Sequence, residues 1–276
     1  MFPSIQETCE QSLSGRGVYL YCFTPPGVPA EPPDVESSGR GRLIAGEVAA
    51  VFSTVPLADW QGPAAEAHLQ DSQWVIPRAL AHEQVIEKHL ARGPVLPVRF
   101  GAIFSSEAAL LEFMRPRLGE ISQFLDRMRE LEEWSLKGYL HSEAAEQWVA
   151  LSDPALAERR QRLPAAPGAR YFQEKRLQAE IQERARQLGR TLAESLAADL
   201  TAPAVEVRPL GSRPPDDSGR EMILHAALLL PRVSVGAFRD YAERVQAAHR
   251  DRGLTLEITG PWPPFNFCPR WGDESP

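Results

Sequence analysis

The sequence has few cysteines and none of the common catalytic or metal-binding motifs. Its three cysteines, Cys9, Cys22 and Cys268, follow no CxxC spacing, which is typical of free thiols in a reducing compartment rather than of a disulfide framework. The chain contains no Walker loop, no GxGxxG after a strand, no GxSxG and no HExxH. The sequence therefore predicts no catalytic residue, no metal site and no cofactor.

Long apolar runs and an excess of basic charge are also absent. The longest uncharged apolar run, residues 226–231, is far shorter than the roughly 20 residues of a membrane-spanning helix. No N-terminal segment has the order of a signal peptide. The 276 residues are 43% hydrophobic and carry a net charge of −7, which is typical of a globular protein and argues against a nucleic-acid binder. We therefore expect a cytoplasmic protein that binds neither membrane nor nucleic acid.

The first half of the chain alternates between strand-like and helical patterns. A Pro-, Gly- and Ser-rich loop (24–41) separates the first strand from the next, and Ala45 and Gly46 suggest a hairpin. The predicted elements are strands at 17–23 and 42–57, a helix at 77–92, a strand at 94–101, a helical region at 107–131 and a strand at 132–140. This order predicts a ferredoxin-like α+β sandwich over residues 1–150, with helices on one face of an antiparallel sheet.

The second half contains the strongest periodic signal. Apolar residues recur at steps of three or four over residues 169–200, which predicts a long amphipathic helix. The other predicted elements are strands at 204–210 and 221–232, a helix at 234–253 and a strand at 254–260. We therefore expect a second α+β domain over residues 151–276, with the boundary near 145–165.

Two histidines share one face of the first predicted helix. His82 and His89 are two helical turns apart, so about 10 Å of axial rise separates them, too far for one metal ion without other ligands. The simplest interpretation is a polar helix face with incidental histidines.

Arg99, Phe100 and Gly101 end a proline-flanked strand. In the simplest interpretation Phe100 packs in the protein interior and Gly101 turns the chain. Arg99 then pairs with a carboxylate such as Glu83 or Glu133. The alternative is a ligand-binding or enzymatic protein in which His82 and Arg99 converge in a pocket with a perturbed pKa.

The closing segment GPWPPFNFCP, residues 260–269, combines four prolines with three large aromatic residues. Proline fixes φ and removes a hydrogen-bond donor, so the segment must run extended and outside any sheet ladder. Trp262, Phe265 and Phe267 either dock across the protein's own sheet or domain junction, which we favour, or form an aromatic platform for a partner.

Four blocks together resemble the gas vesicle GvpL/GvpF family. They are VIPRALAHEQVIEKHL with GPVLPVRFGAIF (75–104), EEWSLKGYL (132–140), the Gly-x-x-Tyr opening of GARYFQEKR (168–176) and LTLEITGPWPPFNF (254–267). The resemblance extends from about residue 17 to 267, and the Pro-rich loop at 24–41 departs from it. The matched positions are His82, Arg99, Phe100, Gly101, Trp134, Tyr171, Trp262, Pro263, Pro264, Phe265 and Phe267.

The resemblance implies two α+β domains and a role in making gas vesicles, the gas-filled, protein-walled organelles that give microbial cells buoyancy. It implies an accessory or minor structural protein whose partners are the small hydrophobic shell subunit and other gas vesicle accessory proteins. The family supplies no catalytic residues. A further alternative is self-association through the long helix, in which Leu188 and Leu192 would meet a second copy.

Overall fold

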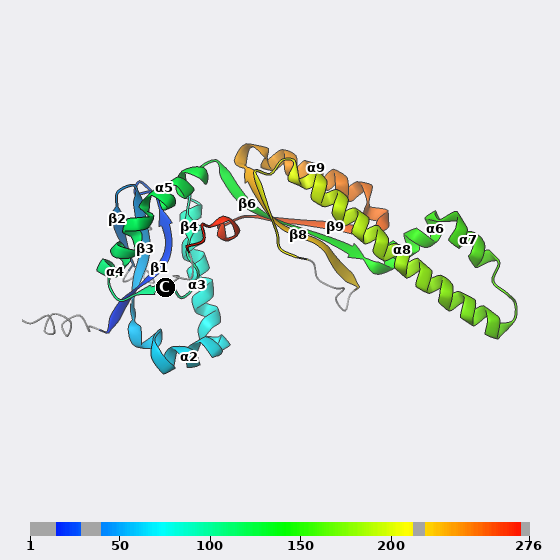
Figure 1. Ribbon diagram of the computed structural model, residues 1–276, viewed down its shortest axis with the longest axis horizontal. Coiled ribbons are helices and arrows are strands. Elements are labelled where there is room, and N and C mark those ends of the chain that lie inside the picture. Colours follow the sequence, from blue (N-terminus) through cyan, green and yellow to red (C-terminus); the bar gives the residue numbers. More distant parts are fainter. Residues whose placement is uncertain (1–14, 29–39, 212–218, 272–276) are drawn as a thin grey trace, which may run out of the picture. The chain divides into compact units, whose positions relative to one another are not determined.

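The computed structural model describes residues 15–28, 40–211 and 219–271, and the chain divides into two compact units. Unit 1 comprises Met1–Glu130 and Pro263–Pro276, and unit 2 comprises Leu131–Trp262 (Figure 1). Within the described residues, no helix has the length and apolar character needed to cross a membrane.

Unit 1 is built on an antiparallel sheet. Its strands are β1 (Arg16–Thr24), β2 (Arg40–Ala45), β3 (Val48–Pro56), β4 (Leu96–Pro97) and β5 (Ile103–Phe104). They are ordered β2-β3-β1-β4, and β5 also pairs with β1. The predicted hairpin at Ala45 and Gly46 is confirmed, because β2 pairs with β3 and Gly46 turns the chain with a φ of 57°.

Helices cover both faces of this sheet. They are α2 (Gly62–Gln70), α3 (Ser72–Leu90), α4 (Glu107–Met114) and α5 (Leu118–Arg127), with short 3-10 helices at Leu57–Asp59, Arg115–Arg117 and Phe265–Phe267. Cys22 of β1 packs on one face with Val85 and Ile86 of α3. Figure 1 shows α3 on one side of the sheet and α4 and α5 on the other. This differs from the prediction of helices on one face only.

Helix α3 begins five residues before the predicted start at Pro77. The Asp71 side chain accepts a hydrogen bond from the backbone N–H of Gln73, so it caps the helix at that point. Pro77 therefore lies inside the helix.

Unit 2 contains the second antiparallel sheet. Its strands are β6 (Leu131–His141), β7 (Glu206–Pro209), β8 (Arg220–Pro231) and β9 (Leu254–Trp262), ordered β7-β8-β6-β9. Its helices are α6 (Ser142–Ser152), α7 (Pro154–Gln161), α8 (Pro167–Thr201) and α9 (Val235–Ala248), with 3-10 helices at Arg232–Ser234 and Arg250–Arg252. The mixed α+β class predicted from sequence is confirmed.

The ferredoxin-like order lies in unit 2, whereas we expected it in the N-terminal domain. The chain runs β6, α8, β7, β8, α9, β9, with α6 and α7 inserted before α8. The physical reason is the pairing of β6, which was predicted as the last strand of the first domain. It pairs with β8 and β9 instead, so it is the first strand of unit 2 and the boundary lies before it, not near 145–165.

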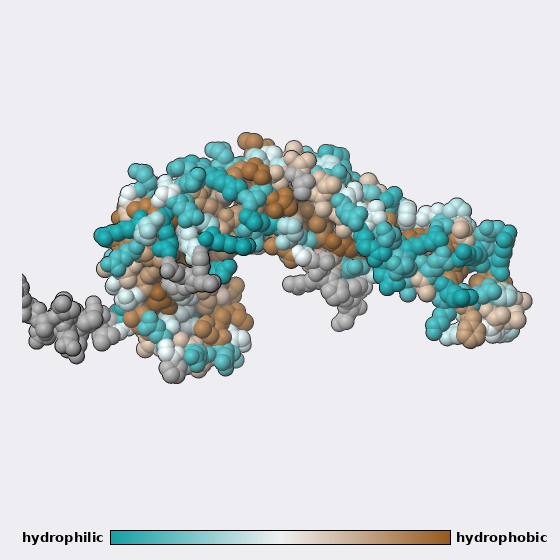
Figure 2. Space-filling model, in the orientation of Figure 1, coloured by the Kyte–Doolittle hydropathy of each residue, from teal (hydrophilic) through white to brown (hydrophobic). Residues whose placement is uncertain are grey.

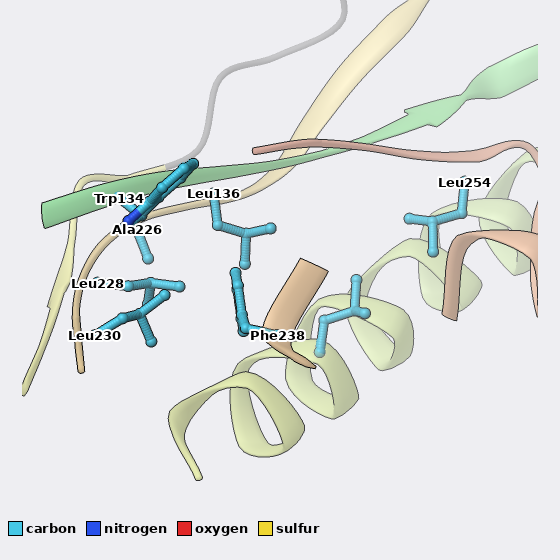
Figure 3. Packing of buried hydrophobic residues seen from close by; sticks show 8 residues of the cluster. Trp134, Leu136, Ala226, Leu228, Leu230, Phe238 and Leu254 are labelled. Carbon is cyan, nitrogen blue, oxygen red and sulfur yellow. The ribbon is translucent and has the colours of Figure 1, made fainter. Parts of the chain in front are cut away.

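The core of unit 2 lies between the sheet and helices α8 and α9. Figure 3 shows Leu136 of β6 pointing toward Phe238 of α9, and Trp134 of β6 packs in the same cluster with Leu228 and Leu230 of β8. Burying each large apolar side chain contributes roughly 2 kcal/mol.

Helix α8 is amphipathic, as its periodicity predicted. Its inward side chains Ile181, Ala185, Leu192 and Leu196 are buried. Leu188 also packs against the core shared with α6. The alternative in which Leu188 and Leu192 meet a second copy is therefore not supported, because the protein's own core occupies that face.

Candidate functional site

His82 holds the turn at residues 98–101 against β1 and α3. The side chain is buried, with Nε2 2.9 Å from the carbonyl oxygen of Val98 and Nδ1 2.9 Å from the hydroxyl of Tyr19. A carbonyl oxygen only accepts, so Nε2 carries the proton and Nδ1 accepts from Tyr19. The backbone N–H of Gly101 in turn donates to the Tyr19 oxygen over 3.3 Å. Both ends of the turn are thus fixed by one network.

The environment of His82 keeps the ring neutral. Burial lowers the pKa of His82, and the hydrogen bond to Val98 only partly opposes this effect. Burial also raises the pKa of Tyr19. Two neutral groups, each with a hydrogen-bond partner, form a structural pair and not a poised acid and base. His89 is likewise buried, and its Nδ1 lies 2.8 Å from the Val85 carbonyl oxygen.

Phe100 and Gly101 take the structural roles expected of them. The Phe100 ring joins an aromatic cluster, with ring centroids 5.6 Å from Trp60 and 5.8 Å from His82. Gly101 has a φ of 92°, a backbone conformation that L side chains rarely adopt. Tyr19 and Trp60 complete this cluster but were not predicted to, because neither lies near residues 98–101 along the chain.

Arg99 points outward and lines a pocket of about 600 Å³. The pocket is also lined by Phe100, Phe113, Arg270 and Trp271, whereas His82 is not among its lining residues. Arg99 is exposed and forms no ion pair with Glu83. The two side chains of the proposed His82/Arg99 site therefore do not converge, since His82 lies in the interior behind the turn.

Contrary to the prediction, the closing segment does not run extended outside any ladder: Trp262 ends β9 and pairs with Glu133, and Phe265–Phe267 form a 3-10 helix. From Pro263 onward the segment docks within unit 1. Phe265 packs against the cluster that Cys22 forms with α3, and Phe267 is buried. The Cys268 thiol lies 3.7 Å from the Pro97 carbonyl oxygen of β4. Farther along, Trp271 donates from Nε1 to a Glu120 carboxylate oxygen at 2.6 Å. Phe265 and Phe267 are thus structural residues of unit 1.

The remaining predicted residues lie in unit 2, where Trp262 of β9 pairs with Glu133, the residue beside Trp134 of β6, and Tyr171 lies apart on α8. Trp134 is buried in the core and donates from Nε1 to a Glu132 oxygen at 3.1 Å. Trp262 is exposed at the end of β9, where its Nε1 donates to the Thr259 hydroxyl. Tyr171 is exposed near the start of α8.

The sequence did not predict an apolar surface on α2 and α3. Leu69 of α2 and Ile76 and Leu80 of α3 are 60%, 56% and 58% exposed. We call these three residues the α2–α3 patch. Leu80 was assigned to the buried face, but with Ile76 one turn earlier it lies on the side of α3 opposite Val85 and Ile86. The predicted start at Pro77 left Ile76 out of the helix, whereas the helix that begins at Ser72 contains both members of this i, i+4 pair.

Across residues 15–28, 40–211 and 219–271, no three His, Cys, Asp or Glu side chains are grouped closely enough to hold a metal ion.

Comparisons with known proteins agree on one family. The family model of the gas vesicle synthesis protein GvpL/GvpF matches residues 17–269. Gas vesicle protein L of a Streptomyces species is 28% identical, covering 91% of this chain and 92% of the relative. Gas vesicle protein L2 of Halobacterium salinarum is 27% identical, covering 98% and 96%.

Solved structures agree in fold. The crystal structure of GvpF from an Anabaena species superposes with a TM-score of 0.66 at 20% identity, covering 92% of this chain and 98% of that one. The GvpF structure from Microcystis aeruginosa gives a TM-score of 0.60 at 19% identity, covering 92% and 99%. Since the family model spans nearly the whole chain, this protein belongs to the GvpL/GvpF family of gas vesicle synthesis proteins.

Proposed function

We propose that this protein is a non-enzymatic assembly factor or minor wall component that binds the small hydrophobic shell subunit of gas vesicles. Membership of the GvpL/GvpF family supports a gas vesicle role and association with other gas vesicle proteins. The observation that carries the finer proposal is the α2–α3 patch, three large apolar side chains that are each more than half exposed.

The α2–α3 patch suits an apolar partner. Figure 2 shows hydrophobic atoms at the end of α3 that adjoins α2, beside hydrophilic ones. Ile76 and Leu80 are neighbours at i, i+4 on α3, and exposed apolar side chains that gather in this way mark an interaction surface more often than a single exposed leucine does. A shell subunit with an apolar, gas-facing surface needs shielding from water until it is incorporated. Contact with this patch would reduce that exposed area.

The test is capture of the shell subunit during co-expression. The tagged protein would be purified from cells that also make the shell subunit, and the captured amount compared between wild type and the triple variant Leu69→Gln, Ile76→Gln, Leu80→Gln. Glutamine keeps the helix propensity while removing the apolar surface. We expect capture to fall by about tenfold, which corresponds to the loss of roughly 1.4 kcal/mol.

A matched control tests whether any loss of capture is due to the patch itself or to the removal of exposed apolar side chains in general. Leu151→Gln with Val233→Gln removes two other exposed apolar side chains, both in unit 2, and is expected to leave capture unchanged. Trp262→Ala and Arg99→Ala test two of the three exposed residues that the sequence predicted, the third being Tyr171. Thermal transitions would establish that each variant is folded. Failure of well-folded wild type to capture the shell subunit, even with the other accessory proteins present, would rule out direct shell binding.

A further inference from the structure

The first ten residues of α8 extend beyond the core of unit 2. All of residues 167–176 are exposed, whereas from Leu177 onward one side of the helix packs against the core. Most helical stability in proteins comes from packing an apolar face, so an exposed extension of this length needs another explanation. Two features of its sequence point to a partner.

The extension carries two neighbouring aromatic side chains. Tyr171 and Phe172 are 61% and 69% exposed, and their ring centroids are 5.8 Å apart. Lys175 and Arg176 lie one helical turn farther on, at i+4 from each ring, and are also exposed. Neither cation forms an ion pair with any residue that the structure describes. One side of the helix therefore presents an aromatic turn followed by a basic turn.

The surrounding charge has the opposite sign to that of the chain. We call residues 154–176, from the start of α7 through the extension, the basic tip. It contains six basic residues and two glutamates, a net charge of +4, although the whole chain carries −7. The basic residues are Arg159, Arg160, Arg162, Arg170, Lys175 and Arg176.

Ion pairs hold the basic tip in place. Arg159 of α7 pairs with Glu180 of α8, and Asp153, which caps α7, pairs with Arg184 of α8. On the extension itself, Arg170 pairs with Glu174 at 2.9 Å. These contacts leave Lys175 and Arg176 as cations presented on a fixed helix pair. Figure 2 shows hydrophobic atoms beside strongly hydrophilic ones where α7 and the start of α8 lie.

We propose that the basic tip docks an acidic amphipathic helix of a protein partner. Apolar residues of that helix would cover Tyr171 and Phe172, and its carboxylates would face Lys175 and Arg176. Charge complementarity selects an acidic occupant, and the one-turn spacing of rings and cations matches the i, i+4 spacing of a facing helix. Nucleic acid and anionic lipid fit less well, because the rest of the chain is strongly acidic and would be repelled by an extended polyanion. The proposal does not depend on shell binding through the α2–α3 patch.

The test measures binding of a labelled synthetic helix to the full-length protein by fluorescence anisotropy. The probe is an amphipathic peptide of about three heptads with leucines on one face and glutamates on the other, compared with a peptide in which lysines replace the glutamates. We expect the glutamate peptide to bind at least about tenfold more tightly than the lysine peptide, with affinity that falls as salt rises. Lys175→Glu with Arg176→Glu should weaken it at least about tenfold, and so should Tyr171→Ser with Phe172→Ser.

The control reverses two charges elsewhere. Arg92→Glu with Arg115→Glu changes the net charge equally, at exposed arginines of unit 1, and should alter the affinity less than about twofold. Far-UV circular dichroism would show that the helices persist. The proposal is overturned if the two peptides bind alike, if the glutamate peptide does not bind, or if the control weakens binding as much as the tip variants. It is also overturned if duplex DNA or phosphatidylserine vesicles bind the tip more tightly than the glutamate peptide.

Discussion

Two aromatic segments of this chain have opposite fates. In the part of the closing segment that belongs to unit 1, from Pro263 onward, Phe267 is buried and Phe265 packs against the core. At the start of α8 (167–176), Tyr171 and Phe172 lie in water. Aromatic content therefore does not determine burial. The two segments differ in backbone conformation, and therefore in which part of the protein's own core their rings can contact.

The backbone explains the difference. Prolines restrict the backbone of the closing segment and so reduce the entropy lost on docking. The segment forms a 3-10 helix at Phe265–Phe267 and lies beside β4 of the unit 1 sheet. The start of α8 is helical, and its two rings lie about 100° apart around the axis, with cations on the same side. Packing this side against the apolar core of unit 2 would bury Lys175 and Arg176 without partners.

The largest expected effect comes from removing a docked ring. Phe267→Ala should destabilise unit 1 by about 3 kcal/mol, because it leaves a cavity where a buried ring packed. Hydrogen exchange read on separate peptides would show faster exchange in unit 1 and unchanged exchange in unit 2. Trp262→Ala is the matched control, since this ring is exposed at the end of β9. If the amides of unit 1 exchange equally slowly in wild type and in Phe267→Ala, the closing segment does not stabilise unit 1.

The sequence predicted the elements better than their assembly. The periodicity of α8 and the hairpin at Gly46 are local patterns, and the structure has both. The assignment of β6 to the first domain was wrong because strand pairing is decided by partners far along the chain, here β8 and β9. No local pattern distinguishes a strand that closes one sheet from one that opens the next.

The candidate site, too, depends on contacts between residues far apart in the sequence, which local patterns do not predict. Arg99, Phe100 and Gly101 could be recognised as a distinctive turn, but Tyr19, which joins His82 to Gly101, is more than 60 residues from His82. The α2–α3 patch was missed because Pro77 suggested a helix start, although helix α3 begins at Ser72 and continues through this proline. Sequence motifs thus indicated which residues to consider. Only the tertiary contacts showed which of them are buried and structural and which are exposed and available to a partner.

A smaller effect is expected when pH changes the free energy of unfolding. It arises from a buried histidine in the interior of unit 1 and not from the exposed start of α8. Burial lowers the pKa of His82 in the folded state. Below about pH 6.5 the unfolded chain therefore binds a proton that the folded chain does not, and stability decreases as pH falls toward the lowered pKa. The slope due to His82 is at most about 1.4 kcal/mol per pH unit and vanishes above pH 6.5.

Urea unfolding of wild type and His82→Gln between about pH 7.5 and 5.5 measures this slope. Glutamine retains a donor and an acceptor but does not titrate, so the variant should lose part of the pH dependence. Parallel stability curves for the two proteins would mean that His82 is protonated equally in both states.

The smallest expected effect on stability comes from the exposed pair. Tyr171→Ser with Phe172→Ser should change the free energy of unfolding by less than about 0.5 kcal/mol, because neither ring packs against the core of unit 2. The same variant should lose most of its affinity for the acidic peptide, so stability and binding separate at these positions. Urea unfolding beside the anisotropy titration measures both quantities on one preparation. A destabilisation of about 2 kcal/mol or more would show that the pair packs within the folded chain, and the difference between the two aromatic segments would then disappear.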